Sequence, residues 1–144
     1  KDMNVVPVEK SVMDRIHEGM YQVSHTMDGT AHYLFINYPI KVGSKTGTAE
    51  AFYAGPIQYA TNNPVVNATY IGYAPYDKPE IAVSVVLPYL PADATGRDST
   101  RIARDVMNAY FEREKLHAQR LKAISQINHK QERMELKFQP LFGL

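Results

Sequence analysis

The stretch "GSKTGTAEAF", residues 43–52, carries small polar residues where a core strand would carry large apolar ones. Side chains alternate between the two faces of a strand, so Thr46 and Thr48 share one face while Lys45 and Gly47 share the other. Two threonine hydroxyls about 7 Å apart, with an ammonium nearby, suit a carboxylate, because hydrogen bonds to an ion are stronger than neutral ones. The stretch therefore predicts a carboxylate receptor.

The backbone of the same stretch suggests a second role. Gly47 has no Cβ and would let a bulky ligand approach. If the strand lies at a sheet edge, its free backbone can pair with an extended peptide, and the Thr48 amide can donate to a developing oxyanion. The alternative is a solvated strand with a glycine bulge, so the surrounding sequence has to decide.

The composition limits the classes of protein to consider. The 144 residues, 44% of them apolar, fit one domain or part of one, and the net charge of +1 gives no general attraction to nucleic acid. The absence of cysteine excludes disulfides and thiolate metal sites. No stretch approaches the roughly 18 apolar residues that a membrane span needs, and no signal peptide is evident.

Histidines offer no metal site in this sequence. His25 and His32 flank a turn that contains glycine, and their spacing has no preferred ligand geometry. We therefore expect neither a metal nor a cofactor.

Upstream of the quoted stretch, apolar residues recur at helical spacing. They predict an amphipathic helix from Ser11 to about Val23, with Ser11 as its N-cap. Residues 31–52 are rich in residues typical of sheets, and we expect a strand from about Ile40 to Phe52. Residues 53–66 contain glycine, proline and asparagine and predict a loop.

Downstream, the pattern predicts a hairpin and a helix. Residues 67–76 and 80–90 are expected as antiparallel strands joined by "APYDKPE", and the second is apolar enough to be covered on both faces. Ser99 or Thr100 is expected to cap a helix that packs on the sheet and reaches about Phe111. The predicted fold class is α/β in the layered α+β sense: an antiparallel sheet with flanking helices.

The last part of the chain differs in charge. From Arg101 onward nine Lys or Arg face five Asp or Glu, a net charge of +4, against −3 for the rest. A weaker apolar stripe continues through this part. We expect a domain over residues 1–112 and a basic, helical extension over residues 113–144, whose alternating charges are typical of a solvated face.

Three segments in this order resemble a class B penicillin-binding protein over roughly residues 10–112. They are "GSKTGTAE" after the helix "MDRIHEGMYQVSH", the hairpin "NATYIGYAPYDKPEIAVSVVLPYL", and the helix "STRIARDVMNAYF". The resemblance implies a serine transpeptidase fold, a five-stranded antiparallel sheet with helices on both sides. It also implies D,D-transpeptidation of peptidoglycan stem peptides through an acyl-serine, which β-lactams block by acylating the same serine.

Carried over to this sequence, the resemblance gives each residue of the tetrad a role. Lys45 would supply positive charge near the nucleophile and the substrate carboxylate. Thr46 and Thr48 would bind that carboxylate, Gly47 would leave room for the acyl group, and the Thr48 amide would form one arm of the oxyanion hole. The implied ligands are the D-Ala-D-Ala end of a stem peptide and β-lactams.

Two motifs of this family are missing from the sequence. A Ser-x-x-Lys would carry the nucleophile and its base, and a Ser-x-Asn would stand nearby, but no serine here has either spacing. Both motifs precede the Lys-Thr-Gly strand in the family. We therefore expect a C-terminal part of the transpeptidase domain, inactive without the N-terminal remainder of the protein.

The resemblance also leaves alternatives. A serine β-lactamase or β-lactam sensor uses a similar strand, and a non-catalytic transpeptidase-like scaffold could bind other cell-wall synthesis proteins through the basic tail. For the transpeptidase, the resemblance implies a location at the extracytoplasmic face of the bacterial membrane, with the anchor outside this chain.

Overall fold

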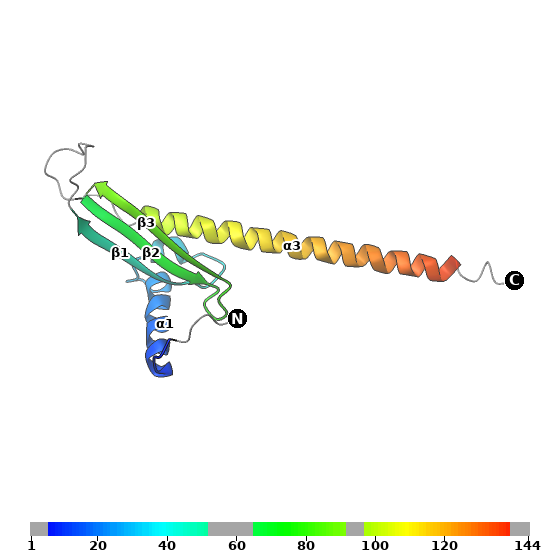
Figure 1. Cartoon of the computed structure of the whole chain (residues 1–144), viewed down its shortest axis with the longest axis horizontal. Coiled ribbons are helices and arrows are strands. Elements are labelled where there is room, and N and C mark those ends of the chain that lie inside the picture. Colours follow the sequence, from blue (N-terminus) through cyan, green and yellow to red (C-terminus); the bar gives the residue numbers. More distant parts are fainter. Residues whose placement is uncertain (1–5, 52–64, 92–96, 139–144) are drawn as a thin grey trace. The chain divides into compact units, whose positions relative to one another are not determined.

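The computed structural model describes residues 6–51, 65–91 and 97–138. In chain order the elements are α1 (Lys10–His25), α2 (His32–Phe35), β1 (Gly43–Ala51), β2 (Val65–Ala74), β3 (Ile81–Pro91) and α3 (Arg97–Phe138) (Figure 1). The chain divides into two compact units, Lys1–Met107 and Asn108–Leu144, and the boundary falls within α3. The first unit contains the sheet.

The sheet is antiparallel with the order β1-β2-β3. β1 pairs with β2 in one continuous register from Gly43↔Tyr73 to Ala51↔Val65. β2 and β3 form the predicted hairpin, with one register shift between Val66 and Ala68. The predicted architecture, an antiparallel sheet with flanking helices, is confirmed.

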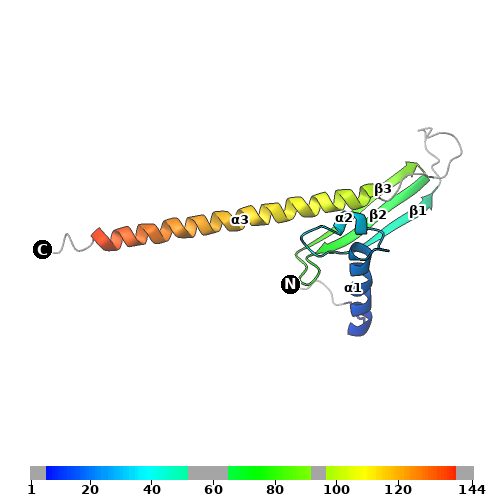
Figure 2. The same cartoon turned by 180° about the vertical axis from the view of Figure 1, so that it is seen from behind.

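The two faces of the sheet differ in burial. Along β2, Ala68, Tyr70 and Ala74 are fully buried, whereas Ile71, on the opposite face, is 51% exposed. This alternation follows from the period of two in a strand. Seen from behind in Figure 2, α2 and the first turns of α3 lie in front of the strands. This is the face of Tyr70, because Phe35 of α2 stacks on its ring.

The core forms where α2 meets this buried face. Phe35 of α2 stacks on Tyr70 with a centroid separation of 6.3 Å, and Tyr38 meets the Phe35 ring edge-on at 5.5 Å. Burial raises the pKa of Tyr70 to about 12, and the nearby Ser44 hydroxyl opposes part of that rise. The other fully buried apolar side chains are Ala31, Val42, Ala103 and Met107.

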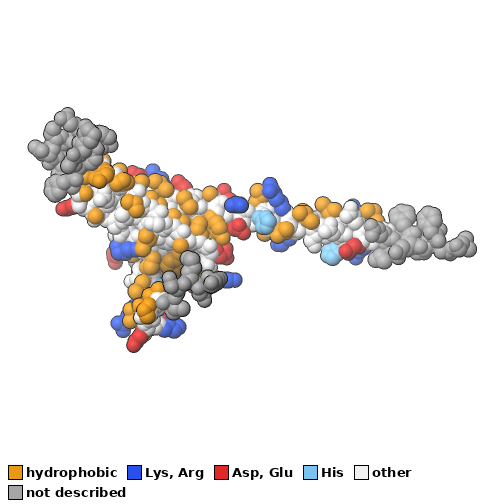
Figure 3. Space-filling model, viewed as in Figure 1, with side chains coloured by type: hydrophobic (Ala, Val, Ile, Leu, Met, Phe, Trp, Pro, Cys, Tyr) orange, Lys and Arg blue, Asp and Glu red, His pale blue; other side chains and the backbone are white. Residues whose placement is uncertain are grey.

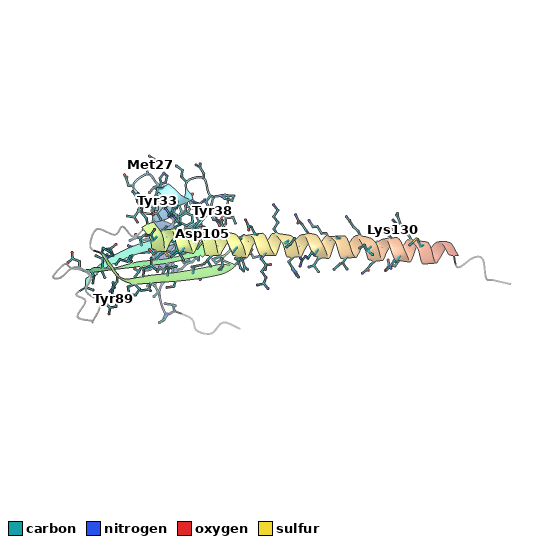
Figure 4. The ribbon with its side chains drawn as sticks, turned by 90° about the horizontal axis from the view of Figure 1, so that it is seen from above. Met27, Tyr33, Tyr38, Tyr89, Asp105 and Lys130 are labelled. Atoms are coloured by element: carbon teal, nitrogen blue, oxygen red, sulfur yellow. The ribbon has the colours of Figure 1, made fainter. Side chains whose placement is uncertain are left out.

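The first turns of α3 are joined to the α2 region by cations lying over aromatic rings. Arg97 lies 5.2 Å from the centroid of the Tyr33 ring, and Arg104 lies 5.9 Å from that of Tyr38. Such contacts contribute about 0.5–1 kcal/mol at exposed sites. Figure 4 shows Tyr33 and Tyr38 close to the start of α3.

The predicted start of the first helix was wrong by one residue. The helix begins at Lys10, and the Glu9 carbonyl accepts hydrogen bonds from the amides of Val12 and Met13 at 3.0 and 3.2 Å. Ser11 therefore lies inside the first turn and is not the N-cap. No side chain caps this end of α1.

The strand predicted from Ile40 begins only at Gly43, and the sheet-like stretch before it contains α2. α2 forms because Phe35 enters the core and the His32 amide donates to the Gly29 carbonyl at 3.0 Å. The Val42 amide donates to His25 rather than to a strand. The predicted end at Phe52 and residues 53–64 of the predicted loop lie outside the described residues. The last two residues of that loop, Val65 and Val66, belong to β2 instead.

Two expectations about the hairpin and the last helix were also wrong. No residue of β3 is buried, and Val86 is 60% exposed, so β3 is not covered on both faces in this chain. Ser99 and Thr100 are not N-caps, because α3 already begins at Arg97. Both are fully buried instead.

The second unit consists, among its described residues, of α3 from Asn108 to Phe138. The rings of Tyr110 and Phe111 meet edge-on at 5.1 Å. Several large apolar side chains are about half exposed, namely Leu116, Leu121, Ile124, Ile127 and Met134. Within the described part of the chain, none of the helices has the length and apolar character that crossing a membrane requires.

Replacing Phe35 tests the core. Phe35→Ala should lower the free energy of unfolding by about 3–5 kcal/mol, because it removes a fully buried ring that stacks on Tyr70. Ile36→Ala is the control, since Ile36 is 53% exposed and the loss should stay within about 0.5 kcal/mol. Chemical denaturation measures both variants, and equal losses would contradict the assignment of Phe35 to the core.

Candidate functional site

The predicted tetrad, Lys45, Thr46, Gly47 and Thr48, lies in the middle of β1, the first strand of the sheet. Within the described part of the chain β1 pairs only with β2, so its other side is a sheet edge. The register runs without interruption through Gly47↔Thr69. The alternative of a glycine bulge at this position is therefore excluded.

The polar groups of the tetrad differ in exposure. Lys45 and Thr48 are exposed, whereas Thr46 is half-buried. The Lys45 ammonium contacts the Thr46 carbonyl oxygen. In an antiparallel strand the backbone groups of residues two apart point to the same side, so the Thr48 amide points to the same side as this carbonyl. The cation and the amide are therefore found on one side of the strand.

A row of three hydrogen bonds joins this strand to the end of α1 and to the turn after it. The Val42 amide donates to Nε2 of His25 at 2.9 Å. The Ser44 and Ser24 hydroxyls lie 2.7 Å apart, and the Thr46 and Thr30 hydroxyls also lie 2.7 Å apart. We call this row the polar ladder, since its rungs stand at every second residue of one chain segment.

Sequence reasoning did not identify the partners in the polar ladder. His25, Ser24 and Thr30 lie 16 to 20 residues before their partners, which are two residues of β1 and Val42 directly before it. A periodic pattern within one element cannot show pairing over such a separation. The only signal in the sequence was the alternation of polar residues at Ser44 and Thr46.

The environment of His25 favours its neutral form. Burial, and secondly the charge of Lys41, lower the pKa of His25 below its ordinary value of 6.5. The ring also stacks on Tyr21 with a centroid distance of 4.6 Å. Only a ring nitrogen without a proton can accept the Val42 hydrogen bond, so the neutral imidazole fits this position.

Gly47 is required for close packing between strands. A Cβ at this position would lie 2.4 Å from Oγ1 of Thr69 on β2, far inside a normal contact. From the sequence, Gly47 was expected to leave space for a ligand. The structure adds a second constraint, because the Cβ direction points at a neighbouring side chain.

The opposite face of the sheet is apolar and open. A shallow cavity of about 320 Å³ is lined there by Met20, Ile71, Tyr73 and Ala82, among others. Figure 3 shows hydrophobic side chains gathered over the strands on the face toward the viewer. Among the described residues, no group of three or more His, Asp or Glu is arranged to hold a metal ion.

Comparison with known proteins identifies the family. Residues 1–108 match the family described as the penicillin binding protein transpeptidase domain. The chain belongs to the penicillin-binding protein transpeptidase family. The resemblance to class B penicillin-binding proteins, inferred from the Lys-Thr-Gly-Thr strand and its neighbours, is thereby confirmed.

Individual relatives agree with this assignment. Penicillin-binding protein 2A of Bacillus subtilis is 38% identical over 112 residues, which cover 76% of this chain and 15% of that protein. Penicillin-binding protein 2B of Streptococcus pneumoniae is 41% identical over 111 residues, with the same shares. Peptidoglycan D,D-transpeptidase MrdA of Escherichia coli is 31% identical over 75 residues, or 49% of this chain and 12% of that protein.

A solved structure shows the same fold. The structure of penicillin-binding protein 2B from Streptococcus pneumoniae strain R6 aligns with a TM-score of 0.66 and 34% identity. The aligned region covers 78% of this chain and 17% of the chain in that structure. This chain thus spans about 15% of the length of the curated relatives named first. The roles of Lys45, Thr46, Gly47 and Thr48 stay predictions.

The close approach at Gly47 predicts a rescue experiment. Gly47→Ala should destabilise the protein by about 1–3 kcal/mol, the usual cost of overpacking, because the new methyl group meets Thr69. Adding Thr69→Ala should recover most of this loss, which thermal unfolding can measure. If the double variant is as unstable as the sum of the two single variants, the contact does not explain the glycine.

The low pKa of His25 predicts a pH dependence of stability. The unfolded chain binds a proton near pH 6.5 and the folded chain only at lower pH, so the stabilisation is fully present above about pH 6.5. It is lost as the pH falls through the folded pKa. His25→Gln should flatten the fall of the melting temperature between pH 8 and pH 5, whereas His117→Gln, at an exposed position on α3, should not. An unchanged slope in His25→Gln would show that His25 does not cause the pH dependence of stability.

Proposed function

We propose that this chain is the part of a peptidoglycan D,D-transpeptidase that binds the substrate carboxylate and the oxyanion. One observation carries the proposal: the Lys-Thr-Gly-Thr tetrad occupies an edge strand with Lys45 and Thr48 exposed, in a chain of the transpeptidase family. An edge strand can accept an extended peptide as an added strand. The stem peptide would bind along β1.

In this proposal the side chains of the tetrad bind the substrate carboxylate, and its backbone binds the oxyanion. The hydroxyls of Thr46 and Thr48 donate to the terminal carboxylate of D-Ala-D-Ala, and the Lys45 ammonium adds a positive charge. The Thr48 amide donates to the oxygen that becomes negative when the carbonyl is attacked. Fixed donors of this kind stabilise the transition state more than the ground state.

The nucleophile comes from the N-terminal remainder of the same protein. A serine oxygen attacks the carbonyl carbon of the D-Ala-D-Ala amide, the C–N bond breaks, and D-Ala leaves with a proton. An amine of a neighbouring stem peptide then attacks the ester and releases the serine. β-Lactams acylate the same serine. The open apolar face at Ile71 and Val86 supports the presence of such a remainder, because a partner surface would cover it.

The domain limits and the location belong to the same proposal. We assign residues 1–112 to the transpeptidase domain and residues 113–144 to a basic extension with no catalytic role. The whole protein would act at the extracytoplasmic face of the bacterial membrane, together with other cell-wall synthesis proteins. Neither a metal nor a cofactor takes part in the proposed chemistry.

Labelling with a fluorescent penicillin tests the reaction class. Mass spectrometry of the complete protein should find an adduct on a serine outside this chain, because the proposed mechanism has substrate and β-lactam acylate the same serine. A β-lactamase would lose the adduct rapidly, whereas a transpeptidase should keep it. The absence of any adduct would favour a non-catalytic scaffold over the proposed enzyme.

Replacing Lys45 tests the tetrad itself. Lys45→Ala in the complete protein should lower the second-order rate constant of penicillin acylation by about 10²-fold or more, as for loss of a transition-state donor. Lys78→Ala, which removes an exposed lysine in the hairpin turn, is the matched control and should acylate normally. Normal acylation by Lys45→Ala with an intact fold would remove Lys45 from the mechanism.

A further inference from the structure

We propose that Thr30 is a positioning residue that directs the hydroxyl proton of Thr46 toward the substrate carboxylate. This inference rests on the proposed function, in which Thr46 donates to that carboxylate. Its basis is the outermost rung of the polar ladder, where Oγ1 of Thr30 lies 2.7 Å from Oγ1 of Thr46. The distance is typical of a hydroxyl–hydroxyl hydrogen bond.

The direction of this hydrogen bond follows from proton counting. Each hydroxyl has one proton to donate, and without a ligand either threonine can be the donor. An ionised carboxylate only accepts hydrogen bonds, so a bound carboxylate takes the Thr46 proton. Thr30 must then donate to Thr46. The chain Thr30 to Thr46 to carboxylate is cooperative, because each hydrogen bond polarises the next.

The backbone around Thr30 fixes it in place. The Gly29 amide donates to the Thr26 carbonyl at 2.9 Å, and the Ala31 amide donates to the Val23 carbonyl at 3.0 Å. Gly29 lies so close to α1 that a Cβ there would be 2.4 Å from the Gln22 and Val23 carbonyl oxygens. On the other side of Thr30, Ala31 is fully buried. The turn therefore presents Thr30 to β1 in one position.

The other rungs support a specific role for the Thr30 rung. The Ser24–Ser44 pair is fully buried, so a ligand in solvent does not reach its hydroxyls. Thr30 is exposed and Thr46 is half-buried. The outermost rung therefore lies where a ligand at the strand edge can reach it, beside the exposed Lys45 and Thr48.

The test compares two ligands, of which one carries an anionic carboxylate and the other the neutral methyl ester of the same group. Acylation of the complete protein is measured with benzylpenicillin and with its methyl ester, which lacks the anionic carboxylate. Thr30→Val removes the hydroxyl at nearly constant volume and should slow acylation by benzylpenicillin about three- to tenfold, the worth of one hydrogen bond. The ester should be slowed less, because a hydrogen bond to its neutral carbonyl oxygen is weaker than one to a carboxylate. Thr30→Ser, which restores the donor, should recover the normal rate.

Combining substitutions separates this inference from the proposed function. In a Thr46→Val background, Thr30→Val should cause no further loss. A further loss there would overturn the positioning role and indicate that Thr30 binds the carboxylate directly. If Thr46→Val alone leaves acylation by benzylpenicillin unchanged, the carboxylate receptor itself is wrong. If Thr46→Val slows it but Thr30→Val does not, only the role of Thr30 fails.

A structural effect of the substitution gives a different result. Equal slowing with benzylpenicillin and with the ester would mean that Thr30→Val distorts the strand, and would overturn the proposal. Thr30→Ala is the second variant in case valine disturbs the turn, since alanine removes the hydroxyl without adding atoms at an exposed position. It should show the same selective loss with the anionic ligand.

Discussion

The attachment of α1 to the edge strand is the constraint on which the candidate site depends. β1 has a strand neighbour on one side only in the described chain, so the sheet alone fixes half of its backbone. The polar ladder supplies the other restraint, through a histidine, a buried serine pair and a threonine pair. Each hydrogen bond of the polar ladder is short and joins one particular pair of residues. Together they fix both the distance of β1 from α1 and its position along its own axis.

The attachment buries polar groups beside an apolar core. Burying the hydroxyls of Ser24 and Ser44 is unfavourable unless they bond each other, which they do at 2.7 Å. The stacking of Phe35 on Tyr70 lies on the same side of the sheet and supplies apolar burial. The polar and apolar contacts are thus complementary. The first hold β1 to α1, and the second hold the sheet to α2.

The sequence allowed much of this arrangement to be predicted. The hairpin followed from the prolines around Asp77, and the tetrad showed its alternation directly, since both depend on neighbours along the chain. Two of the errors have one origin. Residues 32–35 have a composition typical of sheet, but they form a helical turn that places Phe35 in the core. Ser99 is buried and does not cap a helix. Tertiary packing overrode local preference at both places.

The residues of the candidate site could be predicted, but the residues that hold its strand in place could not. Lys45 and Thr48 were identified from their alternation along the strand together with the family resemblance of the surrounding segments. Thr30 and His25 could not be, because their contacts with β1 join segments that are distant in sequence. A hydrogen bond between distant segments produces no repeating pattern of residues in the sequence. Only the fold shows which polar residues share a rung.

The unprotected side of β3 has a consequence for handling the polypeptide. Its described residues pair with β2 alone, and it carries exposed Val86 and Tyr89. A bare strand of this kind offers its amides and carbonyls to any similar strand in solution. In a recombinant product limited to these 144 residues, this strand edge therefore favours self-templated aggregation.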